Sequence, residues 1–205
     1  ATFALITKGG LDATTKACYH LSLLDDAGTV KFRIAFREAG GTQHASTYAF
    51  TPALGRWYSL AGTFSAAAGL NLYFAARQYE GLPGAAYALV GSASPGAVSA
   101  NGSTTPLRLG AGSSAAGAAQ DGAGAALSEV RIYDQVLALA TLQARQNERL
   151  VGTEAGLVGY WRADEWMSPA ALDYERAYSL TSKLYDRASA TARDATLVGS
   201  PEWTD

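Results

Sequence analysis

Cysteine, histidine and long apolar runs are scarce in this chain of 205 residues, and each scarcity removes a class of protein. The single Cys18 excludes an internal disulfide and says little about the redox compartment. Two histidines and one cysteine are too few for a convincing zinc site. No apolar run approaches the roughly 18 residues that a membrane-spanning helix needs, so we expect no insertion into a membrane.

Excess charge is also missing. The formal net charge is −2 at neutral pH, and no run of lysine or arginine occurs. A nucleic-acid-binding protein or one that docks on anionic lipid would carry a basic patch, so we expect neither partner. The chain also lacks a starting methionine and a signal peptide, from which we expect a processed or excised piece.

Alternating apolar and polar residues are the main pattern that is present. In the clearest strand, we expect four side chains to face a core, Val30, Phe32, Ile34 and Phe36, and three to face water, Lys31, Arg33 and Arg37. The preceding strand alternates likewise, with one set facing one way, Tyr19, Leu21 and Leu23, and a second set on the wet face, Cys18, His20 and Ser22. Residues 25–28 form the hairpin turn between them, with Gly28 at positive φ. One buried and one wet face indicate an antiparallel sandwich.

Further short strands are expected over 3–7, 47–50, 56–64, 69–75, 86–90 and 106–110, where Pro106 can only begin its strand. Over 127–133 the period is again two, and over 138–150 it changes to the spacing of a helix. A second short helix is an expectation for 170–180, within an insertion at 166–183. The sequence therefore predicts an all-β fold, a two-sheet antiparallel sandwich with one short helix after the Leu127–Tyr133 strand.

Six segments in order, ALITKGG, YHLSLLDDAGTVKFRIAF, LGRWYSLAGTF, LNLYF, PLRLGAG and LSEVRIYDQVL, resemble the laminin-G-like modules of the concanavalin A-like superfamily. The resemblance covers residues 1 to about 150 and implies a jelly roll. GLVGYWRADE at 156–165 and the segment 184–203 resemble the beginning of such a module. We therefore expect one domain over 1–205, in which 156–205 supplies the module-start strands and 156–162 pairs beside the strand at Phe3. A piece of a tandem array, with 156–205 starting the next module, is the alternative.

Two departures from the family pattern concern metal binding and the helix. Ser128 stands where the family commonly has an aspartate, which weakens any inherited calcium site. Weak calcium candidates remain in loops, Asp121, Asp186 and Asp194, although aspartates at such places commonly cap turns. We expect no cofactor. Ala138 stands at the helix N-cap, where the missing side-chain oxygen costs about 1 kcal/mol.

Catalytic patterns are not evident. Sandwich glucanases carry alternating carboxylates on one strand, and no E-x-D-x-E segment occurs here. Cys18 and His20 share a strand face, but nothing nearby orients the imidazole, and His44 has no evident partner. We therefore expect a protein that is not an enzyme.

Sugar binding would use exposed aromatic rings. Trp57 and Trp161 fall within strands and are expected in the core or covering a sheet, so they are not the best candidates. The candidates are Trp166, Tyr174, Tyr178 and Tyr79, which can equally pack on the sandwich or contact another protein chain. The resemblance implies an extracellular or surface-displayed recognition or adhesion module that binds a glycan. The alternative is a structural module of an assembly, such as a phage tail-fibre or capsid-decoration protein. In that case the partner is another protein chain, in a homo-oligomer or a larger assembly. A glucanase-like hydrolase is the third hypothesis.

Overall fold

The structure is a computed structural model that describes residues 1–9, 18–76, 84–100, 102, 106–113, 119–120, 125–162, 183–184 and 195–196. The chain forms two compact units. The first comprises Ala1–Gly124 and Val136–Arg149, and the second comprises Ala125–Gln135 and Leu150–Asp205. The chain therefore leaves the first unit, returns to it and leaves it again.

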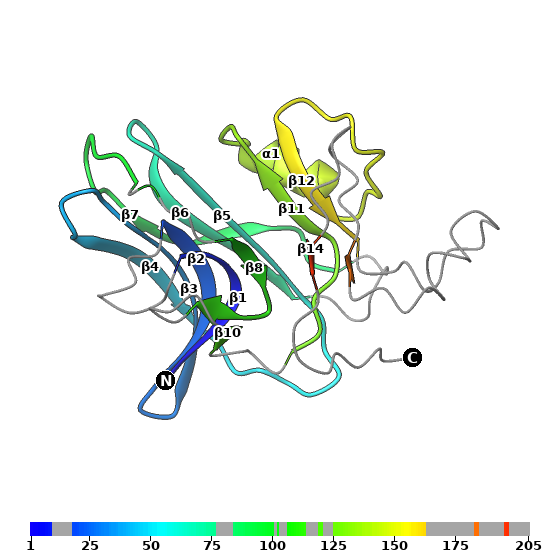
Figure 1. Cartoon of the computed structure of the whole chain (residues 1–205). Coiled ribbons are helices and arrows are strands. Elements are labelled where there is room, and N and C mark those ends of the chain that lie inside the picture. Colours follow the sequence, from blue (N-terminus) through cyan, green and yellow to red (C-terminus); the bar gives the residue numbers. More distant parts are fainter. Residues whose placement is uncertain are drawn as a thin grey trace. The chain divides into compact units, whose positions relative to one another are not determined.

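The first unit contains a five-stranded and a three-stranded antiparallel sheet (Figure 1). In the larger sheet the strand order is β4-β3-β2-β1-β8, with bounds β1 (Thr2–Lys8), β2 (Tyr19–Asp26), β3 (Thr29–Arg37), β4 (Gln43–Ala49) and β8 (Leu107–Leu109). The smaller sheet has the order β5-β6-β7, with bounds β5 (Tyr58–Ser65), β6 (Gly69–Ala76) and β7 (Ala88–Ala93). A short pair, β9 (Gly112–Ser113) and β10 (Ala119–Gln120), also belongs to this unit. These strands form the antiparallel jelly-roll sandwich that the sequence predicts.

Aromatic side chains join the two sheets of the first unit. The ring of Phe32 on β3 lies 5.6 Å from that of Phe74 on β6, measured between centroids, and Phe36 lies 4.1 Å from Phe64 on β5. Phe32 and Phe36 are almost fully buried, as their alternation predicts. A glycine on β5 allows the sheets to approach closely, because a Cβ on Gly62 would overlap the end of Ile34. The core of the sandwich therefore lies between β3 and the β5–β6 hairpin.

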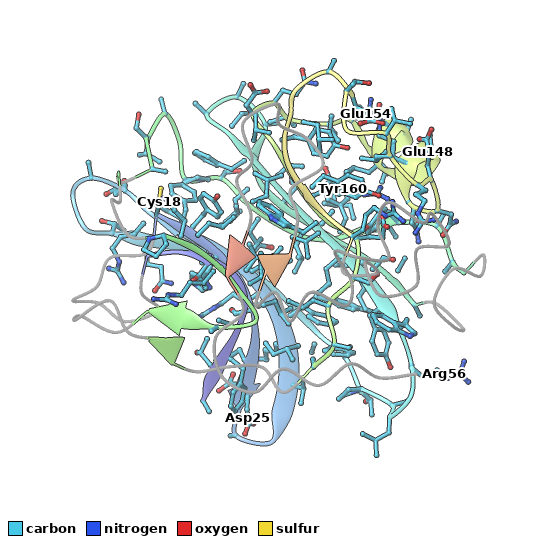
Figure 2. The ribbon with its side chains drawn as sticks, turned by 45° about the vertical axis from the view of Figure 1, so that its right-hand side comes forward. Cys18, Asp25, Arg56, Glu148, Glu154 and Tyr160 are labelled. Carbon is cyan, nitrogen blue, oxygen red and sulfur yellow. The ribbon has the colours of Figure 1, made fainter. Side chains whose placement is uncertain are left out.

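The hairpin of β2 and β3 turns through Ala27 and Gly28, and Asp26 pairs with Thr29. Both turn residues have positive φ, 51° and 85°, as a two-residue type I′ turn requires. The Asp25 carboxylate, at the tip labelled in Figure 2, accepts a hydrogen bond from the Gly28 amide at 2.9 Å. Because this turn fixes the pairing, it also fixes which side chains share each face of the sheet.

The helix α1 (Leu139–Arg145) is shorter than the predicted 138–150 and lies in the first unit. Ala138 is its N-cap and makes no side-chain capping bond, which confirms that prediction. The amide of Gln146 holds the chain ahead of β7: its Oε1 accepts from the Tyr87 amide at 2.9 Å, and its Nε2 donates to the Ala85 carbonyl at 2.8 Å. Gln143 adds a bond to the Tyr87 carbonyl. The polar side chains of Gln143 and Gln146 thus complete the hydrogen bonding of residues 85–87.

In the second unit, β11 (Val130–Tyr133) pairs with β12 (Leu157–Trp161), and β13 (Lys183–Leu184) pairs with β14 (Ala195–Thr196). The prediction that 156–162 pairs beside the strand at Phe3 is wrong, because the neighbours of β1 are β2 and β8. The edge that this segment was expected to cover is instead covered by β8. Trp161 is buried, as predicted, whereas Trp57 lies just before β5 rather than within a strand. Membership of 1–205 in one domain stays a prediction, as does the helix expected over 170–180, which lies outside the described residues.

Candidate functional site

The outer face of the five-stranded sheet, turned away from the aromatic core, gathers polar side chains. Cross-strand partners share a face, so Ser22, paired with Arg33, lies on the side opposite Phe32. We call this surface the polar face, and its central members are Thr7, His20, Ser22, Arg33, Ala35, Arg37, Gln43, Ala45, Thr47 and Arg108.

Burial along the polar face differs from the expectation of a wet surface. Thr7, His20, Ser22 and Ala35 are all at most 1% exposed, and Arg33 is half-buried. The residues that β4 contributes remain exposed, Gln43, Ala45 and Thr47. The prediction that Cys18, His20 and Ser22 lie on a wet face is therefore wrong for His20 and Ser22, and the one that Arg33 points to water holds only in part. Simple alternation cannot distinguish a solvated face from a face with a buried polar floor.

His20 is the centre of this floor. Its Nδ1 lies 3.2 Å from Ser22 Oγ, and its Nε2 lies 3.3 Å from the amide nitrogen of Gln43. An amide nitrogen can only donate, so Nε2 is the acceptor and Nδ1 carries the proton that it donates to Ser22. Burial, with the charges of Arg33 and Arg37, lowers the pKa of His20 to about 3. The imidazole is therefore neutral at physiological pH, and it serves as a fixed hydrogen-bonding element.

The charged groups of the polar face are mostly cations. Its described strand residues include one carboxylate, Asp26, which accepts a hydrogen bond from Lys31 Nζ at 2.7 Å. Glycoside hydrolysis needs two carboxylates across the scissile bond, and this part of the face offers no second one. Among the described residues, no group of three or more histidines, cysteines or acids is placed to hold a metal ion. The arrangement suits binding through hydrogen bonds and guanidinium groups.

A second polar cluster lies in the second unit, around Tyr160, labelled in Figure 2. The Tyr160 hydroxyl donates to Glu129 Oε2 at 2.7 Å, and Arg131 Nη2 donates to the same oxygen at 2.7 Å. The Leu150 amide donates to the Tyr160 oxygen at 3.3 Å. Burial and then Glu129 raise the pKa of the Tyr160 phenol, which stays a neutral donor. These bonds hold β11, β12 and residue 150 together, so we assign the cluster a structural role.

Only some of the residues that the sequence singled out lie in the described part of the chain. The sugar-binding candidates, Trp166, Tyr174, Tyr178 and Tyr79, and the calcium candidates, Asp121, Asp186 and Asp194, lie outside the described residues. Ser128, in place of the family's aspartate, donates its hydroxyl to the Arg162 carbonyl at 3.2 Å. His44, expected to have no partner, lies 3.2 Å from a Glu38 carboxylate oxygen through its Nε2, so that expectation is wrong. The sequence did contain the signal for the polar face, because His20, Arg33 and Arg37 fall on one side of the predicted hairpin.

Comparison with protein families decides the class of the chain. The family model of the concanavalin A-like lectin/glucanases superfamily, of the laminin G type, matches residues 3–143. The chain belongs to this superfamily. The match covers the strands of the larger and smaller sheets except for Thr2, the first residue of β1, and it ends within α1. Neither the curated proteins nor the solved structures yielded a match to this lectin/glucanase-type module. No helix in the described part is both long and apolar enough to cross a membrane.

Proposed function

We propose that this module is a non-catalytic, extracellular or surface-displayed recognition module, and that it binds a glycan on the polar face. The observation that carries the proposal is a sheet face outside the core whose floor is polar and buried while its β4 side is exposed. Family membership supports a carbohydrate-binding type of module, and the polar face is where the described residues offer the donors and acceptors that sugar hydroxyls need.

The exposed part of the face combines adaptable polar groups with small ones. Gln43 and Thr47 present an amide and a hydroxyl, and Ala45 between them is a low point where a sugar ring can approach the strand. The bond to His20 holds the Gln43 side chain across β3, where the small Ala35 leaves room for it. A donor that is held in place before binding loses less entropy when a ligand arrives, which favours recognition.

A glycan array with matched variants tests this proposal. Wild type should bind a subset of glycans, and Gln43→Ala and Thr47→Ala should each weaken that binding, by up to about tenfold for one lost hydrogen bond. Thr51→Ala is the control, because Thr51 is also exposed but lies in the loop after β4. Binding that falls with Trp166→Ala and not with the β4 variants would place the ligand away from β4. No binding to any glycan, together with a stable homo-oligomer by light scattering, would favour a structural module of an assembly.

A further inference from the structure

Among the described strand residues of the polar face, cations outnumber carboxylates. Asp26 and Lys31 form an ion pair at the hairpin end, and three guanidinium groups lie on the same face: Arg33, Arg37 and Arg108. Within the described part of the chain, neither Arg33 nor Arg37 has an acidic partner. This local excess contrasts with the net charge of −2 for the whole sequence.

Arg33 is the most unusual of these cations because it is half-buried and no described carboxylate forms an ion pair with it. Its Nη2 reaches Thr2 Oγ1 only at 3.4 Å, and its Nε is buried with no hydrogen-bond partner. Burial lowers the pKa of Arg33. A half-buried cation without a described counter-ion costs free energy, and an anion bound at the exposed part of the guanidinium group would relieve that cost.

Arg37 lies on the same face of β3, four residues further along. At about 3.3 Å per residue the two α-carbons are roughly 13 Å apart, with the methyl group of Ala35 halfway between them. The positive charges of both guanidinium groups lower the pKa of His20, which pairs with Ala35. Both charges are therefore felt at the part of the face that lies between the two arginines. Arg37 Nη1 donates to the Gly41 carbonyl, which anchors one end of its side chain. Arg33 and Arg37 therefore flank a covered stretch of the sheet, since Ala35 and His20 between them are at most 1% exposed.

We propose that the polar face selects acidic glycans, and that Arg33, assisted by Arg37, binds the carboxylate of a uronic acid residue. This inference rests on the proposed glycan binding and adds the class of sugar. The guanidinium group of Arg33 is only half-buried, and such a group presents parallel N–H groups that match the two oxygens of a planar carboxylate. The neutral, exposed hydrogen-bonding groups of β4 would then contact the hydroxyls of the same chain of sugars.

The test compares ligands that differ only in charge. Calorimetry would measure wild-type binding to oligogalacturonate and to its methyl ester, in which the same sugars carry no charge. We expect the acid to bind at least about tenfold more tightly, and Arg33→Gln to remove that preference. Arg33→Lys, which keeps the charge and loses the fork, should retain only part of it. Arg56→Gln is the matched control, because Arg56 projects from the loop before β5 (Figure 2) and should leave both affinities unchanged.

Thermal unfolding without ligand separates a binding role from a structural one. Because Arg33 is a half-buried cation with no acidic partner in the described part of the chain, Arg33→Gln should unfold at the wild-type temperature or above it. A clear drop would show that Arg33 stabilises the fold, and would overturn its assignment to a ligand.

The other outcomes are equally distinct. Equal affinity for the acid and its ester would overturn the acidic specificity while leaving glycan binding in place. Preference for dextran sulfate over dextran, with no response to oligogalacturonate, would overturn the carboxylate assignment. Absence of binding to every glycan would instead overturn the proposed function itself.

Discussion

Lowering the pH should weaken the fold through His20, because the folded protein holds this imidazole neutral and the unfolded chain does not. In the unfolded chain the pKa is near 6.5, and in the folded protein it is about 3. Between these values the unfolded state binds a proton that the folded state does not, so stability is complete above pH 6.5 and falls as the pH drops toward 3. From about pH 7.5 to about pH 5 the expected loss is about 2 kcal/mol, and it reaches about 4 kcal/mol at pH 3.

Urea unfolding of wild type and His20→Gln at several pH values measures this term. The variant should be less stable at neutral pH by about 1–3 kcal/mol, since Ser22 and Gln43 lose a partner, but its stability should depend less on pH. The two curves should therefore converge as the pH falls. His44→Gln, which changes the other histidine, should keep the wild-type dependence on His20. Equal losses in wild type and His20→Gln, or a folded His20 that titrates in an NMR experiment near pH 6, would refute the buried, neutral imidazole.

Three further substitutions test the packing and the helix. Ala138→Asp should supply the missing N-cap and add about 1 kcal/mol, which raises Tm by about 2–4 °C in a chain of this size. Gly62→Ala should cost about 1–3 kcal/mol because the added Cβ overlaps Ile34. Gly102→Ala is the control, because its Cβ would meet no atom within 4 Å and the change should be neutral. Equal urea midpoints for the two variants would contradict the close approach of the sheets. Tyr160→Phe should cost about 2 kcal/mol by removing a hydrogen bond to a carboxylate, and unchanged unfolding would show that the bond contributes nothing.

The sandwich could be predicted from the sequence because strand alternation and turn chemistry are local. The β2–β3 hairpin illustrates this: a two-residue loop with Gly28 fixes the register, and Phe32 and Phe36 then follow into the core. The helix could be placed for the same reason. Its end could not, because the apolar spacing does not show that the Gln146 amide bonds to the Gln143 carbonyl, where the helix ends.

The alternation of apolar residues could not predict which strands pair across long sequence separations. The segment 157–161 reads as an apolar strand, but nothing within it specifies β11 rather than β1 as its neighbour. The choice depends on the side chains that meet across the pair, such as Tyr160 and Glu129, which lie 31 residues apart. Likewise, alternation assigned His20 to the correct face and still failed to predict that this face is buried.

The site is less predictable than the fold, because assigning a role to Arg33 depends on which described groups surround its side chain. A sequence shows that Arg33 is a cation on a strand, and it does not show that the Nε atom is enclosed without an acceptor. The aromatic residues singled out from the sequence, among them Trp166 and Tyr79, lie outside the described residues, so their part in binding stays a prediction.

The order in which the chain visits its two units limits how the protein can be divided. Cutting after residue 124 would give a fragment that contains both sheets but has lost 136–149, including the two glutamines that bind the backbone at 85–87. Those backbone groups would be left to water, and β7 would lose the support just ahead of it. No single cleavage separates one unit from all of the other, and a fragment that keeps the first unit whole must extend at least as far as Arg149, including in truncations or grafts onto another protein.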